Sequence, residues 1–192
     1  MKILKTVFLL LVLCAFAYPQ TEDLGMGAFS NNKGPIMLAV DASLVNLDIN
    51  SPYVMFVMYM GAKKENENIV VHRDGVVMVY NGQEYKMPSY KELQKDYRGE
   101  VKDVNLYRQL GKEGIISSWM RFYEFPASGD FFPPVLPKAQ LITDQGSMYN
   151  FTGFRTKLYF KNPGLKRGDK ILIKVTAKNK PELTGDVEVT LK

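Results

Sequence analysis

The sequence predicts an all-β protein, an antiparallel β-sandwich with a short helical insert at about residues 89–111. Three observations lead to this prediction. Apolar and polar residues alternate along three C-terminal segments, residues 154–161, 170–178 and 186–192, as in strands with one face in the core and one in water. Asp-Gly and Asn-Gly pairs supply turns, and apolar runs are short. About nine to eleven short strands with regular turns are typical of a sandwich.

Three apolar runs in the first part of the chain predict strands, at residues 36–40, 44–49 and 53–60. Residues 54–60 are apolar on both faces, which suits a central strand that is covered on both sides.

The next segment predicts a meander of three strands, at residues 69–73, 76–80 and 83–87. Asp74-Gly75 and Asn81-Gly82 separate them, and such pairs supply the positive φ angles that two-residue hairpin turns need. We therefore expect two hairpins here.

The helical insert begins at a capping box. Ser89 and Glu92 match its pattern, with a hydroxyl at the N-cap and a carboxylate three residues later, and predict a helix over roughly residues 90–97. Asp103 is expected to cap a second helix, which Gly111 ends.

After the insert, residues 115–125 predict a long strand. Residues 126–137 contain four prolines and predict a loop. Residues 138–143 predict a further strand.

Two stretches resemble parts of bacterial immunoglobulin-like domains. The Gly168-Asp169 turn, which precedes an alternating strand within residues 165–176, is similar to the closing strands of such domains. Residues 79–85 are similar to one of their common hairpins. The resemblance covers about forty residues and consists mostly of turn chemistry. It implies an immunoglobulin-like arrangement of the sandwich and points to no particular family.

The first seventeen residues predict a secretory signal peptide. Lys2 and Lys5 give a positive start, and residues 6–16 form an apolar run that is too short to span a membrane. An Ala-Phe-Ala sequence ending at Ala17 suits cleavage before Tyr18.

The predicted domain organisation follows from that leader. Residues 1–17 are the signal peptide, residues 18–34 a flexible N-terminal segment, and residues 35–192 a single β-sandwich domain. Cys14, the only cysteine, belongs to the leader, so no disulfide is expected in the mature chain. We expect an exported protein, periplasmic or extracellular, with no transmembrane span after signal removal.

The titratable residues predict no catalytic set, no metal site and no cofactor. His72 is the only histidine, and its neighbour Asp74 is explained by a turn. No phosphate-binding glycine loop or basic recognition helix is present, so nucleic acid is not an expected partner. A carboxylate pair such as Glu124 and Asp144 leaves a carboxylate-dependent hydrolase as an alternative.

Aromatic residues are dense between positions 119 and 132. A row of exposed rings can stack on sugars, which predicts a glycan-binding module as a second alternative. Its candidate residues are Trp119, Tyr123, Phe131 and Phe132. Phe131 and Phe132 are expected to be exposed, because the two prolines that follow prevent a paired strand. Burial of the same rings in the core is the competing interpretation.

The formal net charge of +5 is unevenly distributed. Residues 153–192 hold ten Lys or Arg against four Asp or Glu. If the last strands pair with one another, six cations share one solvated face: Arg155, Lys157, Lys161, Lys170, Lys174 and Lys178. Lysines of this kind protect edge strands from pairing with other chains. The alternative is weak attraction to an anionic surface.

Together these patterns predict an exported, non-enzymatic binding or structural protein of the bacterial periplasm or cell surface. The expected partners are a glycan, an envelope protein or an anionic surface.

Overall fold

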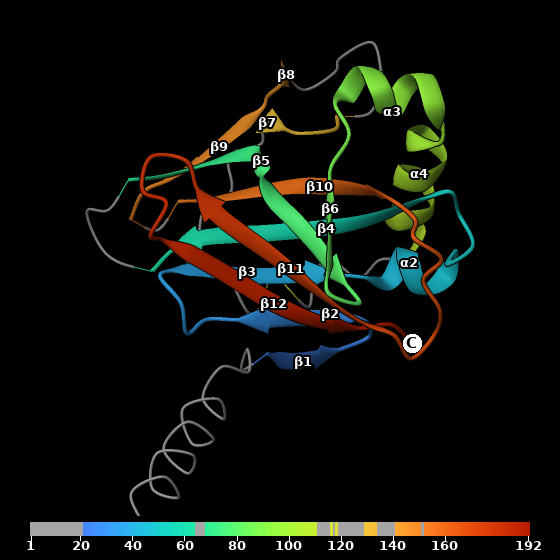
Figure 1. Cartoon of the computed structure of the whole chain (residues 1–192), viewed down its shortest axis with the longest axis horizontal. Coiled ribbons are helices and arrows are strands. Elements are labelled where there is room, and N and C mark those ends of the chain that lie inside the picture. The colour runs from blue at the N-terminus through green and yellow to red at the C-terminus, as the bar shows by residue number, and fades with distance from the viewer. Residues whose placement is uncertain are drawn as a thin grey trace, which may run out of the picture.

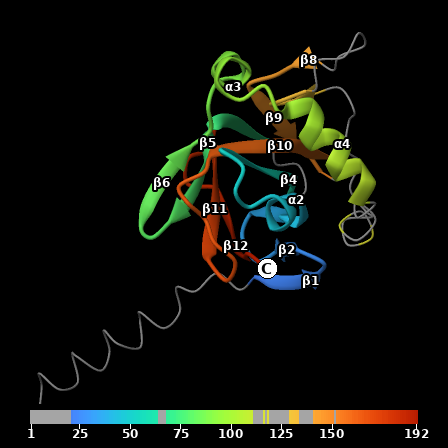
Figure 2. The same ribbon diagram turned by 90° about the vertical axis from the view of Figure 1, so that its right-hand side faces the viewer.

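The computed structural model describes residues 21–63, 68–110, 116, 118, 129–133, 141–150 and 152–192. This part of the chain is mostly β-structure, arranged in two antiparallel sheets that do not close into a barrel (Figure 1). It is consistent with the predicted β-sandwich. The helical insert stands at one end of the sheets, beside β10 and α2 (Figure 2).

The first sheet has five strands in the order β1-β2-β3-β4-β10. They are β1 (Glu22–Gly25), β2 (Ala28–Asn31), β3 (Ile36–Asp41), β4 (Tyr53–Ala62) and β10 (Gly153–Lys161). Every neighbouring pair is antiparallel, and β10 aligns with β4 along its whole length, from Gly153 opposite Gly61 to Lys161 opposite Tyr53.

The second sheet has the order β12-β11-β5-β6, and β9 pairs with the first part of β5. Its strands are β12 (Thr184–Thr190), β11 (Lys170–Ala177), β5 (Ile69–Tyr80), β6 (Gln83–Lys86) and β9 (Gln145–Met148). Two further two-residue strands, β7 (Gly129–Asp130) and β8 (Leu141–Ile142), form a short parallel pair.

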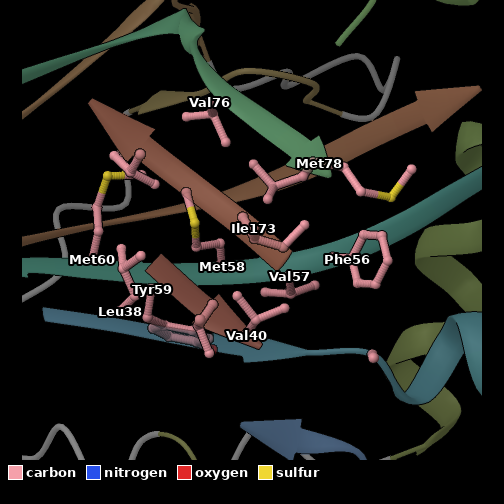
Figure 3. Close-up of a cluster of buried hydrophobic side chains, with 14 of the residues drawn as sticks. Leu38, Val40, Phe56, Val57, Met58, Tyr59, Met60, Val76, Met78 and Ile173 are labelled. Atoms are coloured by element: carbon pink, nitrogen blue, oxygen red, sulfur yellow. The ribbon is translucent and has the colours of Figure 1, made fainter. Parts of the chain in front are cut away.

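The core lies between the two sheets. Met58 and Met60 of β4 extend towards Met78 of β5 and Ile173 of β11, and all four side chains are fully buried (Figure 3). The sheets come closest where β12 crosses β3. A Cβ atom on Gly185 would lie 2.8 Å from the carbonyl oxygen of Ile36, so only glycine allows this approach.

The prediction for β4 is confirmed, because all ten of its residues are buried. The prediction of one wet face for β10 is wrong. Eight of its nine residues are buried or half-buried, and only Lys161 is exposed. Alternation along the sequence identifies the residues that share a face. It does not show that helices and the segment 131–132 cover the second face.

Two predictions near the N-terminus are wrong. Residues 22–31, expected to be part of a flexible segment, form β1 and β2, and β2 is buried throughout. Residues 44–49, expected to be a strand, contain helix α2 (Ser43–Leu47). The Asp41 carboxylate accepts a hydrogen bond from the Ser43 N–H at 2.8 Å, which turns the chain into the helix.

The two predicted hairpins have different outcomes. The turn at Asn81-Gly82 is confirmed, with φ of 50° and 77° and with Tyr80 opposite Gln83. The turn at Asp74-Gly75 is wrong, because β5 runs through it as one twelve-residue strand. Val76 of β5 lies opposite Val175 of β11, but Val71 lies opposite Ala177. The additional residues of β5 between Val71 and Val76 therefore form an irregularity in the pairing of the two strands.

The helical insert is confirmed, with α3 (Tyr90–Asp96) and α4 (Glu100–Leu110). Ser89 and Glu92 form both bonds of the predicted capping box. Asp103 does not cap the second helix. It lies inside α4, where its N–H donates to the Gly99 carbonyl and its side chain is buried.

The segment after the insert is described only in part. Ile116 and Ser118 are helical, which contradicts the predicted strand at those two positions. The other residues of 115–125 lie outside the described residues. The loop predicted at 126–137 is described at 129–133, where β7 forms, and strand pairing in the predicted 138–143 strand is described at Leu141–Ile142.

Candidate functional site

Two of the four residues of the predicted aromatic site are described by the structure, and neither is exposed. Phe131 and Phe132 are fully buried, so the expectation that they form an exposed contact loop is wrong. Phe131 packs on Phe154 and Phe132 on Tyr159, each with ring centroids 5.3 Å apart. The prolines prevent strand pairing but leave the rings free to turn inward. Trp119 and Tyr123 lie outside the described residues.

The predicted basic face is also wrong, because β10 and β11 belong to different sheets. Arg155 of β10 stacks on Tyr59 and donates to its hydroxyl at 3.0 Å, and Lys157 is buried. On β11, the Lys170 ammonium contacts Glu188 at 2.9 Å, and that of Lys174 lies 3.9 Å from Glu84. The remaining two members of the set lie at strand ends: Lys161 is the last residue of β10, and Lys178 follows β11. Opposite charges therefore interrupt the cluster.

The most unusual charged group in the described part of the chain is a buried ion pair. The Lys157 ammonium donates to Oδ2 of Asp130, and both side chains are at least nine-tenths buried. Burial lowers the pKa of Lys157, although the Asp130 charge acts in the opposite direction. Isolated buried charges are strongly unfavourable, so each partner depends on the other.

Among the described residues β10 is the last strand of its sheet, and Asp130 hydrogen-bonds to it along that outer edge. Its Oδ1 accepts hydrogen bonds from the Lys157 N–H at 3.1 Å, the Thr156 hydroxyl at 3.0 Å and the Phe132 N–H at 3.1 Å. The Phe131 N–H donates to the Thr156 hydroxyl oxygen at 2.9 Å. Hydrogen bonds from the segment 131–132 and from β10 thus hold the Asp130 carboxylate in place against the strand.

Sequence reasoning missed this pair. Lys157 stands in an alternating strand at a position that resembles a solvated lysine, and Asp130 follows a glycine in a proline-rich segment. A lysine and an aspartate that are 27 positions apart carry no sequence signal that predicts their contact.

A second polar cluster lies between α4 and the outer face of the first sheet. The Tyr97 hydroxyl bonds to Oδ1 of Asp103 at 3.1 Å and to the Ser51 hydroxyl at 2.9 Å. Burial raises the pKa of Asp103 to about 6 and that of Tyr97 to about 12. Burial and the nearby Asp103 also hold the pKa of Tyr159 well above its usual range.

Among the described residues, no hydrogen-bond partner is found for three buried oxygens of the same cluster, namely Oδ2 of Asp103, Oε1 of Glu100 and the Tyr159 hydroxyl. A cavity of about 10 Å³ adjoins it, lined by Ser51, Asp103 and residues of α2 and β4. This is about the volume that a single water needs. This cavity is therefore too small to hold an organic substrate.

A larger hollow lies where β5 and β11 lose their regular pairing. It measures about 320 Å³ and is lined by His72, Asp74, Gly75, Thr176, Ala177, Lys178 and Pro181. The Asp74 N–H donates to Nδ1 of His72 at 3.2 Å, so the imidazole is held by its own strand. His72, Thr176 and Lys178 thus border one open surface together with Asp74, whose carboxylate lies 3.4 Å from Nδ1 of His72.

The predicted hydrolytic pair is not assembled by the described residues. Asp144 forms an ion pair with Arg73 at 2.8 Å, and Glu124 lies outside the described part. Within the described ranges, no three His, Cys, Asp or Glu side chains gather as a metal site would require. The helices of those ranges are too short or too polar to cross a bilayer.

No protein-family model matches the chain, and no significant match is found among curated proteins or solved structures.

Proposed function

We propose that the chain is an exported, non-enzymatic β-sandwich protein of the bacterial periplasm or cell surface, with a structural or binding role. The observation that carries this proposal is the position of the first strand relative to the leader pattern. Residues 1–17 have the features of a signal peptide, and β1 begins at Glu22, soon after the expected cleavage site. Removal of the leader would leave both described sheets intact.

A structural role is supported by the use of the buried acids. Asp41 accepts a hydrogen bond from the Tyr107 hydroxyl at 3.0 Å, Asp103 from Tyr97, and Asp130 from β10. Each acid joins elements of the fold to one another. Catalytic acids instead need contact with a substrate-sized space. The immunoglobulin-like form of the sandwich is likewise a proposal, supported by the turn at Gly168-Asp169.

Export is tested with residues 1–17 fused to a reporter enzyme that is active only outside the cytoplasm. We expect activity from the native leader and loss of activity for Leu11→Arg, because a charge interrupts the apolar run. Sequencing the N-terminus of the exported full chain should then give Tyr18 as the first residue. Equal reporter activity from both leaders, or retention of residues 1–17 in the exported protein, would contradict the proposal.

For a binding role, we propose the hollow beside His72 as the contact surface for an acidic polysaccharide. Lys178 supplies a cation there, and His72 and Thr176 supply polar groups. In an NMR titration with a purified acidic polysaccharide, amide shifts should cluster at these residues and weaken with added salt. Lys178→Ala should reduce them, whereas Lys161→Ala on β10 should not. Shifts elsewhere, or none, would exclude this surface.

A further inference from the structure

The buried pair of Lys157 and Asp130 places an amine directly against a carboxyl group. Nζ of Lys157 contacts Oδ2 of Asp130, and the two side chains are 9% and 4% exposed. Neither group can exchange its partner for water without opening the segment 129–133. The pair is thus held together for the lifetime of the fold, which corresponds to a very high effective concentration.

The second oxygen of the same carboxyl group faces three donors. The Thr156 hydroxyl and the backbone N–H groups of Phe132 and Lys157 all lie 3.0–3.1 Å from Oδ1. These donors satisfy the buried carboxylate oxygen, and they also lie where negative charge would develop if Cγ were attacked. Several fixed donors on one carbonyl oxygen are the means by which proteins stabilise a tetrahedral intermediate when a nucleophile attacks that carbon.

Burial also makes the neutral form of the Lys157 amine more accessible than it is for a lysine in water, because a buried site disfavours the ammonium charge. The lowered pKa of Lys157 is consistent with this effect. A neutral lysine amine is a nucleophile, whereas an ammonium is not.

We propose that Lys157 and Asp130 condense within the folded chain to form an amide cross-link between Nζ and Cγ. The nitrogen lone pair attacks Cγ, and the negative charge develops on Oδ1, where the three donors lie. The Cγ–Oδ2 bond then breaks. Oδ2 leaves as water with two of the three protons that the Lys157 ammonium carried, and the third stays on the amide nitrogen. The reaction therefore requires no oxidant, metal or further reactant.

The surroundings suit condensation better than hydrolysis. Phe131 and Phe132 are fully buried beside the pair and pack on Phe154 and Tyr159. These rings exclude water, which the reverse reaction needs. The cross-link would fasten segment 129–133 to the free edge of β10. This inference goes beyond the proposed function and applies whether or not the chain is exported.

The test is mass spectrometry of the purified full chain after denaturation and trypsin digestion. A cross-linked Lys157 resists trypsin, so we expect a branched peptide that joins residues 122–138 to residues 156–161. The intact chain should be one water lighter than its sequence requires. A full sequence mass, with cleavage after Lys157, would overturn the proposal. Loss of water without the branched peptide would also overturn it.

Matched variants separate the bond from the ion pair. Lys157→Arg keeps the charge but should give only its own full sequence mass. Thr156→Val removes one donor from Oδ1, so the branched peptide should accumulate more slowly after refolding, and Thr156→Ser should restore the native rate. Cross-linking of Thr156→Val at the native rate would remove Thr156 from its positioning role. The measurement on the native chain stands even if a variant fails to fold.

Discussion

Strands β10 and β11 have similar sequences and different surroundings. Both alternate apolar residues with lysines, yet Lys157 of β10 is buried against Asp130, whereas the Lys174 side chain of β11 is 45% exposed. The difference arises from what covers the second face. The rings of Tyr97, Phe131 and Phe132 pack on β10, while the outer face of β11 is half-buried or exposed. The same sequence pattern therefore gives Lys157 of β10 a fixed, buried partner, whereas Lys174 of β11 has only an exposed ion pair.

The largest expected effect comes from removing a single lysine from each strand. Lys157→Ala leaves Asp130 buried without its counterion and should lower the free energy of unfolding by about 3–5 kcal/mol. Lys174→Ala should lower it by less than about 1 kcal/mol, because its ion pair is exposed and long. Urea unfolding of both variants measures the difference. Equal losses would mean that the two strands do not differ as described.

The pH dependence of stability tests a second buried acid, Asp103, on the covered side of the first sheet. The folded-state pKa of Asp103 is about 6, above its ordinary value of 3.8. Between these pH values the folded chain binds more protons than the unfolded chain, so this group's contribution to stability falls as the pH rises from about 4 to 6. The total fall is at most about 3 kcal/mol.

Asp103→Asn should remove that dependence and stabilise the protein at neutral pH, because the amide can still accept from Tyr97. Urea unfolding of both proteins at a series of pH values gives the difference curve. A flat difference between pH 4 and 7 would show that Asp103 is not buried as an anion.

Two glycines compare the contact between the sheets with an exposed turn. Gly185→Ala should destabilise by about 1–3 kcal/mol, since its Cβ would press on the Ile36 carbonyl and force β12 away from β3. Gly82→Ala meets no atom within 4 Å and should lose about 1 kcal/mol, from its positive φ alone. Thermal unfolding ranks the two variants. A larger loss at Gly82 would contradict the close packing of the sheets.

The smallest effect is expected at the start of the helical insert. Ser89→Ala removes the hydroxyl that accepts from the Glu92 N–H, and should lower stability by about 1 kcal/mol. Ser89→Asp retains a capping acceptor and should stay close to the native value. Urea midpoints for the three proteins are sufficient to test this. Identical values for all three would show that the capping box does not contribute.

Local chemistry predicted local features well. The capping box at Ser89 and the turn at Asn81-Gly82 depend on residues next to one another, and both are confirmed. The Asp74-Gly75 turn failed although it uses the same chemistry. The surrounding strand pairs with β9 before this point and with β11 and β6 after it, and these pairings keep the chain extended although the register with β11 is irregular there.

Features that depend on tertiary contacts could not be predicted from the sequence. The local sequence is compatible with either exposure or burial of Phe131 and Phe132. Packing on the rings of Phe154 and Tyr159 buries them. The predicted basic face required β10 and β11 to lie in one sheet. The alternation of apolar and polar residues does not indicate the order of strands in a sheet, so it could not show that the two strands belong to different sheets.

The central claim is that Asp130 and Lys157 act as one unit that closes the edge of β10. A double-mutant cycle with Asp130→Ala and Lys157→Ala tests it most directly, with Lys170 and Glu188 as the exposed reference pair. We expect each buried single variant to lose several kcal/mol, about 3–5, and the double variant to lose far less than the sum. Losses that simply add, as expected for the exposed pair, would contradict the account.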